Sequence, residues 1–265
     1  VPCVWHRQTA NGLAHVPVAA LRGCMQAVNA AGGGDIPVLA ACKGFEPNSG
    51  LLPFQVLEQV LPANPCVGVL SGPSFAQELA QGLPCAVCLA SANGEWIGAL
   101  AAALNTEVLR LYANSDVVGV CVGGAVVMAV AAGLSDGLGC GMNARAALMT
   151  RGLAEMTRLA VALGAQAKTL MGLSGMGDLL LTCTGGLSRN RQVGLALAEG
   201  RALADILADL GHVAEGIPAI AEVHHSAQRL GVNMPVTAAL ADLLDGRIAA
   251  ADIAARLMQR EPTAE

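Results

Sequence analysis

The sequence predicts two kinds of domain in succession, an α/β domain followed by an all-helical one. Up to about residue 115, short apolar runs of strand length alternate with helical segments, and proline or glycine stands at the junctions. This alternation is typical of a parallel sheet covered by helices. After Asn114-Ser115-Asp116 the pattern changes to long helical segments. We therefore divide the chain into residues 1–115 and 116–265.

Four apolar runs in the first part have the length of buried strands. The run 36–41 contains no polar residue, as expected of a strand that is buried on both faces. Residues 1–15 show no clear period, and we expect a frayed terminus there. The other strands are predicted at 67–70, 86–90 and 108–112, with helices at 18–30, 51–60, 75–81 and 94–104.

In the second part, the longest helical pattern covers residues 143–164. Asn143 is its candidate N-cap and Gly164 its C-terminal stop. Arg151 and Glu155 are four residues apart, which predicts an ion pair on its outer face. Further helices are predicted at 189–198, 203–210, 218–230, 236–245 and 249–258.

The run 117–134 carries no charge over eighteen residues, which is long enough for a membrane span. Its flanks are Asp116 and Asp136, however, with no basic cluster and no aromatic belt. Alanine and glycine dominate it rather than leucine. The run therefore predicts a helix buried inside a bundle and no membrane span.

Composition excludes several classes of protein. The 265 residues are 54% hydrophobic and 13% charged, which excludes a disordered chain, and the net charge of −5 provides no basic field for nucleic acid. Nine cysteines are scattered through apolar runs, as expected of reduced, buried thiols. No basic segment followed by an apolar core begins the sequence. We therefore expect a cytoplasmic location and no metal site.

The most distinctive stretch is 171–200, which contains a lone carboxylate inside an apolar run and, later, two arginines. Asp178 stands inside an apolar run, where a buried acid needs an ion-pair or hydrogen-bond partner. Ten residues on, Ser188-Arg189-Asn190 opens a helical pattern, and N–H groups at a helix start attract anions. Two interpretations stay open: a ligand site made by Asp178 and this helix start, or a helix cap with a solvated arginine.

Two further candidates follow predicted strands, where the ligands of open α/β sheets gather. Lys43 comes directly after one strand and can meet a phosphate as a point charge. Gly72 follows another strand and permits close approach of the backbone, and the hydroxyl of Ser74 can bind a ligand. The alternatives are a surface lysine and an ordinary strand-to-helix turn with Ser74 as its N-cap.

Several motifs in a fixed order resemble the bacterial NAD(P)-dependent glycerol-3-phosphate dehydrogenases. The similarity runs from about Val16 to near the C-terminus, and the ordered set is far more specific than any single motif. Besides 171–200, the matching segments are Cys42-Lys43-Gly44-Phe45-Glu46, Ser71-Gly72-Pro73-Ser74-Phe75-Ala76, 119–125, 143–156 and Ala214-Glu215-Gly216.

The resemblance implies a fold, a reaction and a set of site residues. The fold is a partial Rossmann-type dinucleotide-binding domain at 1–115 and an all-helical, 6-phosphogluconate-dehydrogenase-like substrate domain at 116–265, compatible with a homodimer. The reaction is the NAD- or NADP-dependent interconversion of sn-glycerol 3-phosphate and dihydroxyacetone phosphate for glycerophospholipid synthesis. The implied substrate-binding positions are Lys43, Gly72, Ser74, Asp178, Ser188, Arg189 and Asn190. The implied cofactor-binding positions are Lys43, Ala76, Arg189, Val213 and Glu215.

Two departures from the family pattern bear on activity. The resemblance implies a Lys-Asn pair at 127 and 128, with the lysine as general base, but Val127 and Met128 stand there. Valine cannot accept a proton, and general-base catalysis contributes roughly 10²–10⁴ in rate. The sequence also contains no GxGxxG, the turn that anchors a cofactor pyrophosphate.

These departures predict a chain that is truncated at its N-terminus relative to the family, binds cofactor weakly and catalyses poorly. No residue is therefore assigned as catalytic. The alternative function is a non-catalytic remnant of the family that binds a phosphorylated metabolite or a partner protein.

Overall fold

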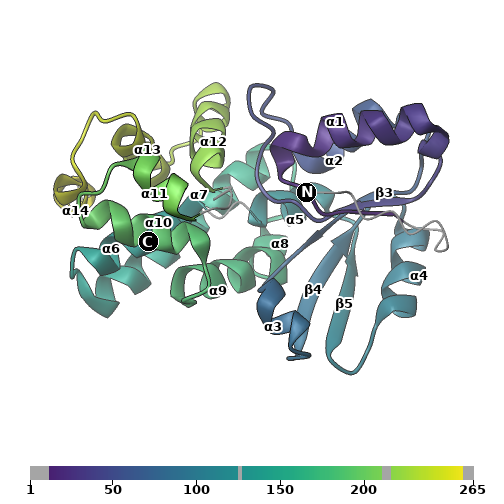
Figure 1. Ribbon diagram of the computed structural model, residues 1–265, viewed down its shortest axis with the longest axis horizontal. Coiled ribbons are helices and arrows are strands. Elements are labelled where there is room, and N and C mark those ends of the chain that lie inside the picture. Colours follow the sequence, from purple (N-terminus) through teal and green to yellow (C-terminus); the bar gives the residue numbers. More distant parts are fainter. Residues whose placement is uncertain (1–11, 125–126, 211–215, 259–265) are drawn as a thin grey trace.

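The computed structural model describes residues 12–124, 127–210 and 216–258. One half of the molecule is a sheet flanked by helices, and the other half is built from helices alone (Figure 1). This arrangement confirms the predicted fold class, an α/β domain followed by an all-helical one.

The sheet has five strands in the order β1-β2-β3-β4-β5. β1, β2 and β3 are parallel, β4 runs antiparallel to β3, and β5 is parallel to β4. Because β2 and β3 are parallel, the residues that follow them emerge at the same edge of the sheet. The strands are β1 (Gly12–Ala14), β2 (Val38–Ala40), β3 (Val67–Ser71), β4 (Cys85–Ala90) and β5 (Leu109–Asn114).

Strand β1 corrects the expectation of a frayed terminus, at least for its last residues. Gly12 lies opposite Val38 in the register, and Leu13 is exposed between two buried neighbours. Three residues are too few to show a period in the sequence, so this strand is determined by its pairing with β2. The earlier residues, 1–11, lie outside the described part of the chain.

Helices cover the sheet on separate sides. α1 (Val18–Val28) and α2 (Pro53–Val60) pack against each other, whereas α4 (Gly94–Leu104) lies along β5 (Figure 1). α4 buries Ile97 and Leu100 against Leu89 and Leu111 of the sheet. Two shorter elements complete this half, the π-helix η1 (Asn29–Gly33) and α3 (Ala76–Ala80).

The helical half follows the predicted succession of helices closely. α10 and α11 have the predicted bounds, and the ends of α12, α13 and α14 lie within two residues of the predictions. The helices are α5 (Val117–Gly123), α6 (Val127–Gly137), α7 (Gly141–Ala162), α8 (Ala167–Leu170), η2 (Leu173–Gly177), α9 (Asp178–Thr184), α10 (Arg189–Ala198), α11 (Leu203–Leu210), α12 (Gly216–Leu230), α13 (Pro235–Leu244) and α14 (Ala250–Met258).

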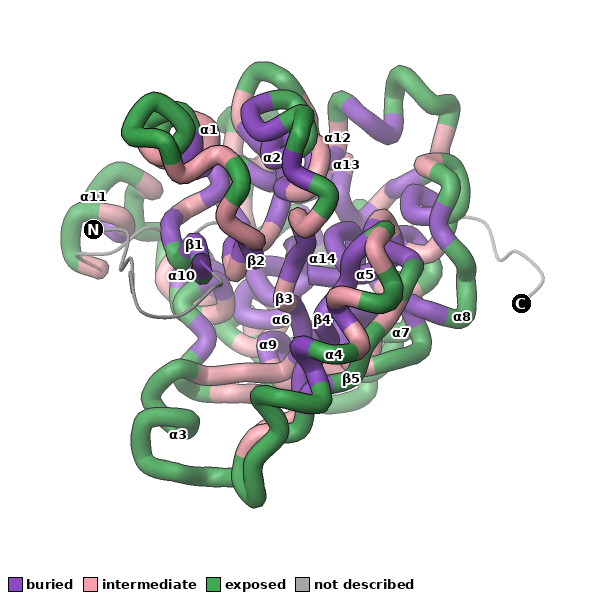
Figure 2. Tube along the Cα trace, turned by 90° about the vertical axis from the view of Figure 1, so that its right-hand side faces the viewer, coloured by how far each residue is buried: buried purple, intermediate pink, exposed green. Residues whose placement is uncertain are grey.

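The apolar run that begins at residue 117 forms α5 and α6 at the centre of the molecule. By length and composition, Val117–Gly137 is the one membrane-span candidate among the described residues, yet 94% of its most apolar window is buried inside the protein. Figure 2 shows both helices as largely buried segments, whereas α3 and α11 are largely exposed at the periphery. This burial supports the interpretation as a core helix.

The alanine and glycine content of this run has a packing reason. A Cβ on Gly133 of α6 would lie 2.0 Å from the carbonyl oxygen of Arg191, and one on Gly194 of α10 would lie 2.1 Å from that of Val130. Real Cβ atoms essentially never come so close, so both positions require glycine. α6 and α10 therefore pack backbone against backbone.

Two expectations for α7 are wrong. The helix begins at Gly141, so Asn143 is not its cap but an exposed residue within the first turn. Glu155 does not pair with Arg151 on the outer face, because it is only 1% exposed and accepts hydrogen bonds from the backbone N–H groups of Val236 (2.7 Å) and Thr237 (3.1 Å). Glu155 thus satisfies the N-terminus of α13.

The cysteines meet the expectation of reduced, buried thiols only in part, because Cys140 is exposed and Cys66 and Cys85 are half-buried. Cys24 is disulfide-bonded, which a scattered spacing in apolar runs could not reveal. The free thiols among the described residues are Cys42, Cys66, Cys85, Cys88, Cys121, Cys140 and Cys183.

Candidate substrate-binding site

An ion pair joins the sheet to the helical half. The Nζ atom of Lys43, three residues beyond β2, lies 2.7 Å from both Oδ1 and Oδ2 of Asp178, the first residue of α9. The same Nζ lies 3.4 Å from the carbonyl oxygen of Gly72, just beyond β3. The expectation that a lone acid in an apolar run needs a partner is met by a lysine 135 residues away.

The two partners differ in exposure. The Asp178 side chain is 1% exposed and that of Lys43 is 21% exposed. Burial raises the pKa of the Asp178 carboxyl, and the positive charge and hydrogen bonds of Lys43 oppose that rise. Lys43 thus favours the ionised form of a buried acid, and the Lys43 side chain itself is partly exposed.

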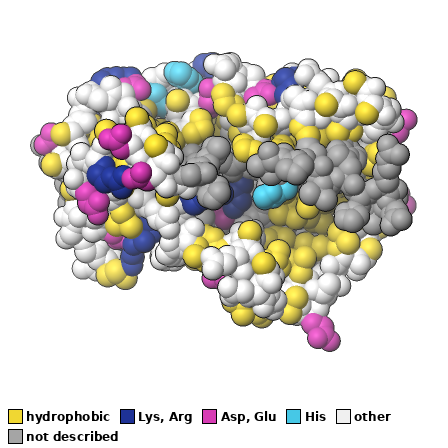
Figure 3. All heavy atoms as spheres, viewed as in Figure 1, with side chains coloured by type: hydrophobic (Ala, Val, Ile, Leu, Met, Phe, Trp, Pro, Cys, Tyr) yellow, Lys and Arg dark blue, Asp and Glu magenta, His cyan; other side chains and the backbone are white. Residues whose placement is uncertain are grey.

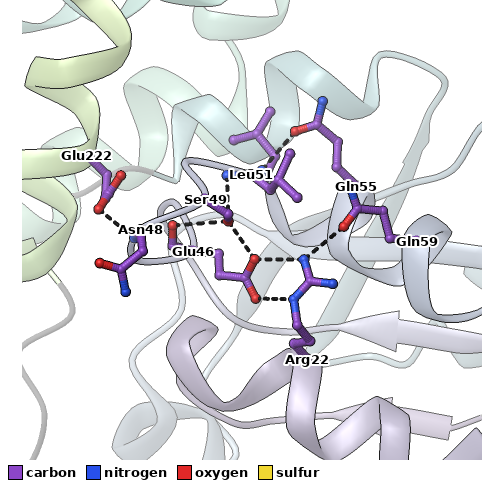
Figure 4. A network of polar contacts seen from close by, with 9 residues as sticks. Arg22, Glu46, Asn48, Ser49, Leu51, Gln55, Gln59 and Glu222 are labelled. Atoms are coloured by element: carbon purple, nitrogen blue, oxygen red, sulfur yellow. Dashed lines mark hydrogen bonds and ion pairs between the residues drawn. The ribbon is translucent and has the colours of Figure 1, made fainter.

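The segment that carries Lys43 is held by a network around Glu46 (Figure 4). The Arg22 side chain donates to Glu46 through Nε (2.9 Å) and Nη2 (2.8 Å), and the Ser49 hydroxyl donates to the same carboxylate at 2.5 Å. The hydrogen bond from Arg22 lowers the pKa of Glu46 below its ordinary value. α1 therefore fixes the loop that follows β2.

The same loop also touches the helical half. The backbone N–H of Asn48 donates to Oε1 of Glu222 on α12 at 2.9 Å, a contact drawn in Figure 4. Gly44 has a φ of 93°, which favours glycine, and a Cβ there would lie 3.3 Å from that of Ala219. Lys43 is thus placed by contacts on both sides of its loop.

The turn after β3 forms the second side of the site. Gly72 has a φ of 138°, and a Cβ there would lie 3.1 Å from Cα of Val87, so a side chain would be strained. Ser74 Oγ lies 3.3 Å from the Gly72 carbonyl oxygen, and Ala76 is exposed at the start of α3. Ser74 is therefore not the N-cap of α3, which follows Phe75 without a side-chain cap.

The start of α10 has the predicted cap. The Ser188 hydroxyl accepts from the backbone N–H of Arg191 at 3.3 Å. Oδ1 of Asn190 accepts from the N–H of Gly216 at 3.1 Å and so ties α10 to α12. Ser188 and Asn190 are buried, whereas the Arg189 side chain is exposed. Arg189 is therefore a cation available to a ligand at this helix start.

A neighbouring acid was not predicted as part of this arrangement. Asp136, near the end of α6, accepts from Arg145 (2.8 Å) and from Arg191 (2.6 Å) through the same oxygen. Because Arg145 belongs to α7 and Arg191 to α10, Asp136 links α6 to both helices, and Arg191 is two residues from Arg189. In the sequence, Asp136 is distinguished only as a charged residue just beyond the apolar run 117–134.

The predicted positions divide into four groups, one of which is Ser74 and Ala76, in the turn after β3 and at the start of α3. Contacts bring Lys43, Gly72 and Asp178 together. Ser188, Arg189 and Asn190 form the start of α10, in the same half as α9, and their contacts go to α10 and α12. Val213 and Glu215 lie outside the described residues.

The structure gives Val127 and Met128 apolar surroundings. Both are 1% exposed and belong to the main hydrophobic cluster. The Met128 side chain fills the space over Gly152 of α7, where a Cβ would lie 2.6 Å from the Met128 Cγ. Neither position offers a titratable group. Among the described residues, moreover, no cluster of His, Cys, Asp or Glu could hold a metal ion.

The shape of this face agrees with a ligand site between the two halves. In the space-filling view, basic side chains lie over the helical half and in the hollow between the halves (Figure 3). The exposed guanidinium of Arg189 supplies one positive charge, and the Lys43 ammonium, paired with Asp178, supplies a hydrogen-bond donor. Such a set fits a small anion that also carries hydroxyl groups.

The two halves of the chain match the two family models for NAD-dependent glycerol-3-phosphate dehydrogenase. The N-terminal model matches residues 7–97 and the C-terminal model residues 116–255. Glycerol-3-phosphate dehydrogenase [NAD(P)+] of Neisseria meningitidis serogroup C is 60% identical over 245 residues, 92% of this chain and 74% of that protein. The Dechloromonas aromatica enzyme is 56% identical over 251 residues, 94% of this chain and 76% of that protein.

Solved structures agree. Glycerol-3-phosphate dehydrogenase from Coxiella burnetii has a TM-score of 0.88 at 36% identity, covering 95% of this chain and 78% of that one. The Saccharomyces cerevisiae enzyme shows the same fold, with a TM-score of 0.82 at 23% identity over 96% of this chain and 76% of that one. With both family models matched and relatives this similar, the chain belongs to the NAD(P)-dependent glycerol-3-phosphate dehydrogenases.

Proposed function

We propose that the site beside the Lys43–Asp178 pair binds sn-glycerol 3-phosphate and dihydroxyacetone phosphate, the substrates of this family. The observation that carries the proposal is a lysine ammonium held by a buried carboxylate at the junction of the two halves. A buried ion pair is weak support for stability, because desolvation offsets most of the attraction. A pair whose lysine side chain is partly exposed fits a binding role better.

The residues of the site have complementary tasks. Lys43 donates to the ligand's oxygens, and Asp178 orients the ammonium and accepts from a ligand hydroxyl when the pair opens. Gly72 and Ser74 offer backbone and hydroxyl groups at the end of β3. Ser188, Arg189 and Asn190 supply the helix start, where a phosphate is attracted by the free N–H groups and the exposed guanidinium.

NAD or NADP is the cofactor of this family and supplies the hydride when bound. Lys43, Ala76 and Arg189 are the described residues that we assign to it, together with Val213 and Glu215. The fit is partial, since the sequence carries no GxGxxG to hold a pyrophosphate. We therefore infer weak cofactor binding by this chain.

Turnover is inferred to be low for a second reason. The position assigned to the family's general base holds Val127, which is buried among apolar side chains and cannot exchange a proton. The same observation favours a second candidate function, a non-catalytic protein that binds the phosphorylated metabolite or a partner. We place the protein in the cytoplasm, with no nucleic acid as partner, and a homodimer stays a prediction for analytical ultracentrifugation.

Isothermal titration with sn-glycerol 3-phosphate tests the binding function. The wild-type chain should bind it and not bind glycerol, and Lys43→Met should weaken binding while Lys168→Met leaves it unchanged. Lys168 is an exposed residue at α8 and provides a matched loss of one lysine. Equal affinity of both variants would show that Lys43 does not bind the ligand. NADH oxidation with dihydroxyacetone phosphate then separates an impaired enzyme from a binding protein.

A further inference from the structure

A cavity lies in the helical half, away from the Lys43–Asp178 pair. It measures about 340 Å³ and lies between α6, α7, α13 and α14. Leu134, Leu148, Leu240 and Ile253 line its inner part, and all four are buried. This volume falls within the roughly 300–1,000 Å³ of small-molecule sites, which are mostly apolar with few polar groups.

Exposed residues, one of them charged, lie at the mouth of the cavity. Arg151 and Cys140 line it and are exposed, as is Ala147 of α7. The predicted partner of Arg151, Glu155, is turned inward to the start of α13. Arg151 is thus a cation at the rim of an apolar cavity. Its expected counter-ion, Glu155, is bound to the start of α13 instead.

We propose that this cavity binds a single-chain aliphatic carboxylate, with its chain between the four helices and its carboxylate at Arg151. An apolar cavity gains free energy when apolar groups replace water or empty space in it. The guanidinium selects for an anionic head over a neutral or cationic one. The ligand class follows from this combination, and the site is independent of the substrate-binding function proposed above.

The proposal is tested by titrating the whole chain with decanoate, decanol and decylamine below their micelle-forming concentrations. Decanoate should bind with a one-to-one ratio and decylamine should not. Arg151→Gln should weaken decanoate binding by roughly two- to fivefold, as for an exposed ion pair, and leave decanol binding unchanged. Arg110→Gln removes the same charge from an exposed position on β5 and serves as the control.

Two further measurements keep the result unambiguous. Ala147→Phe, at an exposed position, should block the mouth and abolish binding of both decanoate and decanol. In the wild-type chain, decanoate should slow alkylation of the Cys140 thiol, followed by mass spectrometry of its peptide. The proposal is overturned if Arg151→Gln and Arg110→Gln bind decanoate equally, or if saturating decanoate leaves the alkylation of Cys140 unchanged.

Discussion

Replacing Lys43 by methionine isolates the consequence of burying Asp178 without its partner. Methionine retains an apolar stem of similar length and removes the charge. Removing one member of a buried ion pair costs about 3–5 kcal/mol, because the remaining charge is left uncompensated. Lys43 itself is 21% exposed, so the lower end applies, about 3 kcal/mol. For a chain of this size that corresponds to a fall in Tm of roughly 6–12 °C.

The loss should depend on pH in a defined direction. Burial raises the pKa of Asp178, and Lys43 opposes that rise, so Lys43→Met should raise the pKa further. An acid whose pKa is higher in the folded state than in the unfolded state favours folding when protonated, and that contribution is lost as pH rises through the folded pKa. The deficit of the variant should therefore be larger at pH 7.5 than at pH 5.

Thermal and urea unfolding of Lys43→Met, Lys168→Met and the Lys43→Met Asp178→Asn double variant provide the assay. Lys168→Met should unfold like the wild type, and the double variant should regain part of the lost stability because no carboxylate is left to be ionised. The reasoning is refuted if Lys43→Met and Lys168→Met unfold at the same temperature at pH 7.5. It is also refuted if the deficit of Lys43→Met grows on acidification.

Three other substitutions test separate parts of the account. Gly133→Ala should destabilise the chain by several kcal/mol in urea unfolding, since its Cβ would meet backbone at 2.0 Å, whereas Gly98→Ala, at an open helical position, should stabilise it by roughly 0.5–1 kcal/mol. Glu155→Ala should cost about 1–3 kcal/mol for each orphaned backbone donor and speed hydrogen exchange at the start of α13; unchanged exchange there would contradict the capping role. Val127→Lys alone should lower Tm, because it buries an ammonium. Val127→Lys combined with Met128→Asn should raise the rate of NADH oxidation about 10²-fold over the wild type; equal rates of the wild type and the double variant would show that another group exchanges the proton.

Local patterns predicted most elements of this fold because those elements are locally determined. The helix at 189–198 could be predicted to the residue, since Ser188 caps it and its apolar period begins at once. Strand β1 could not, because three residues show no period and its place depends on pairing with β2. Glu155 was misplaced for a similar reason: spacing within α7 favoured Arg151, but the donors of α13, some eighty residues on, compete for it.

The candidate site shows the same division. That Asp178 needed a partner followed from its apolar neighbours, but the identity of the partner did not, since Lys43 lies 135 residues earlier. Lys43 and Gly72 could be placed at one edge of the sheet, because they follow two strands that run parallel to each other. Asp136 was missed, because its role depends on two arginines that come to it from different helices.

The central claim is that the Lys43–Asp178 pair and the start of α10 bind one phosphorylated ligand. The most direct measurement is the dissociation constant of dihydroxyacetone phosphate for the wild type, Arg189→Gln and Arg110→Gln. Losing a charge-assisted hydrogen bond costs about 1.5–3 kcal/mol, so Arg189→Gln should bind roughly 10- to 150-fold more weakly, and Arg110→Gln should bind like the wild type. No detectable binding by the wild type, or equal affinity of the two arginine variants, would contradict the account.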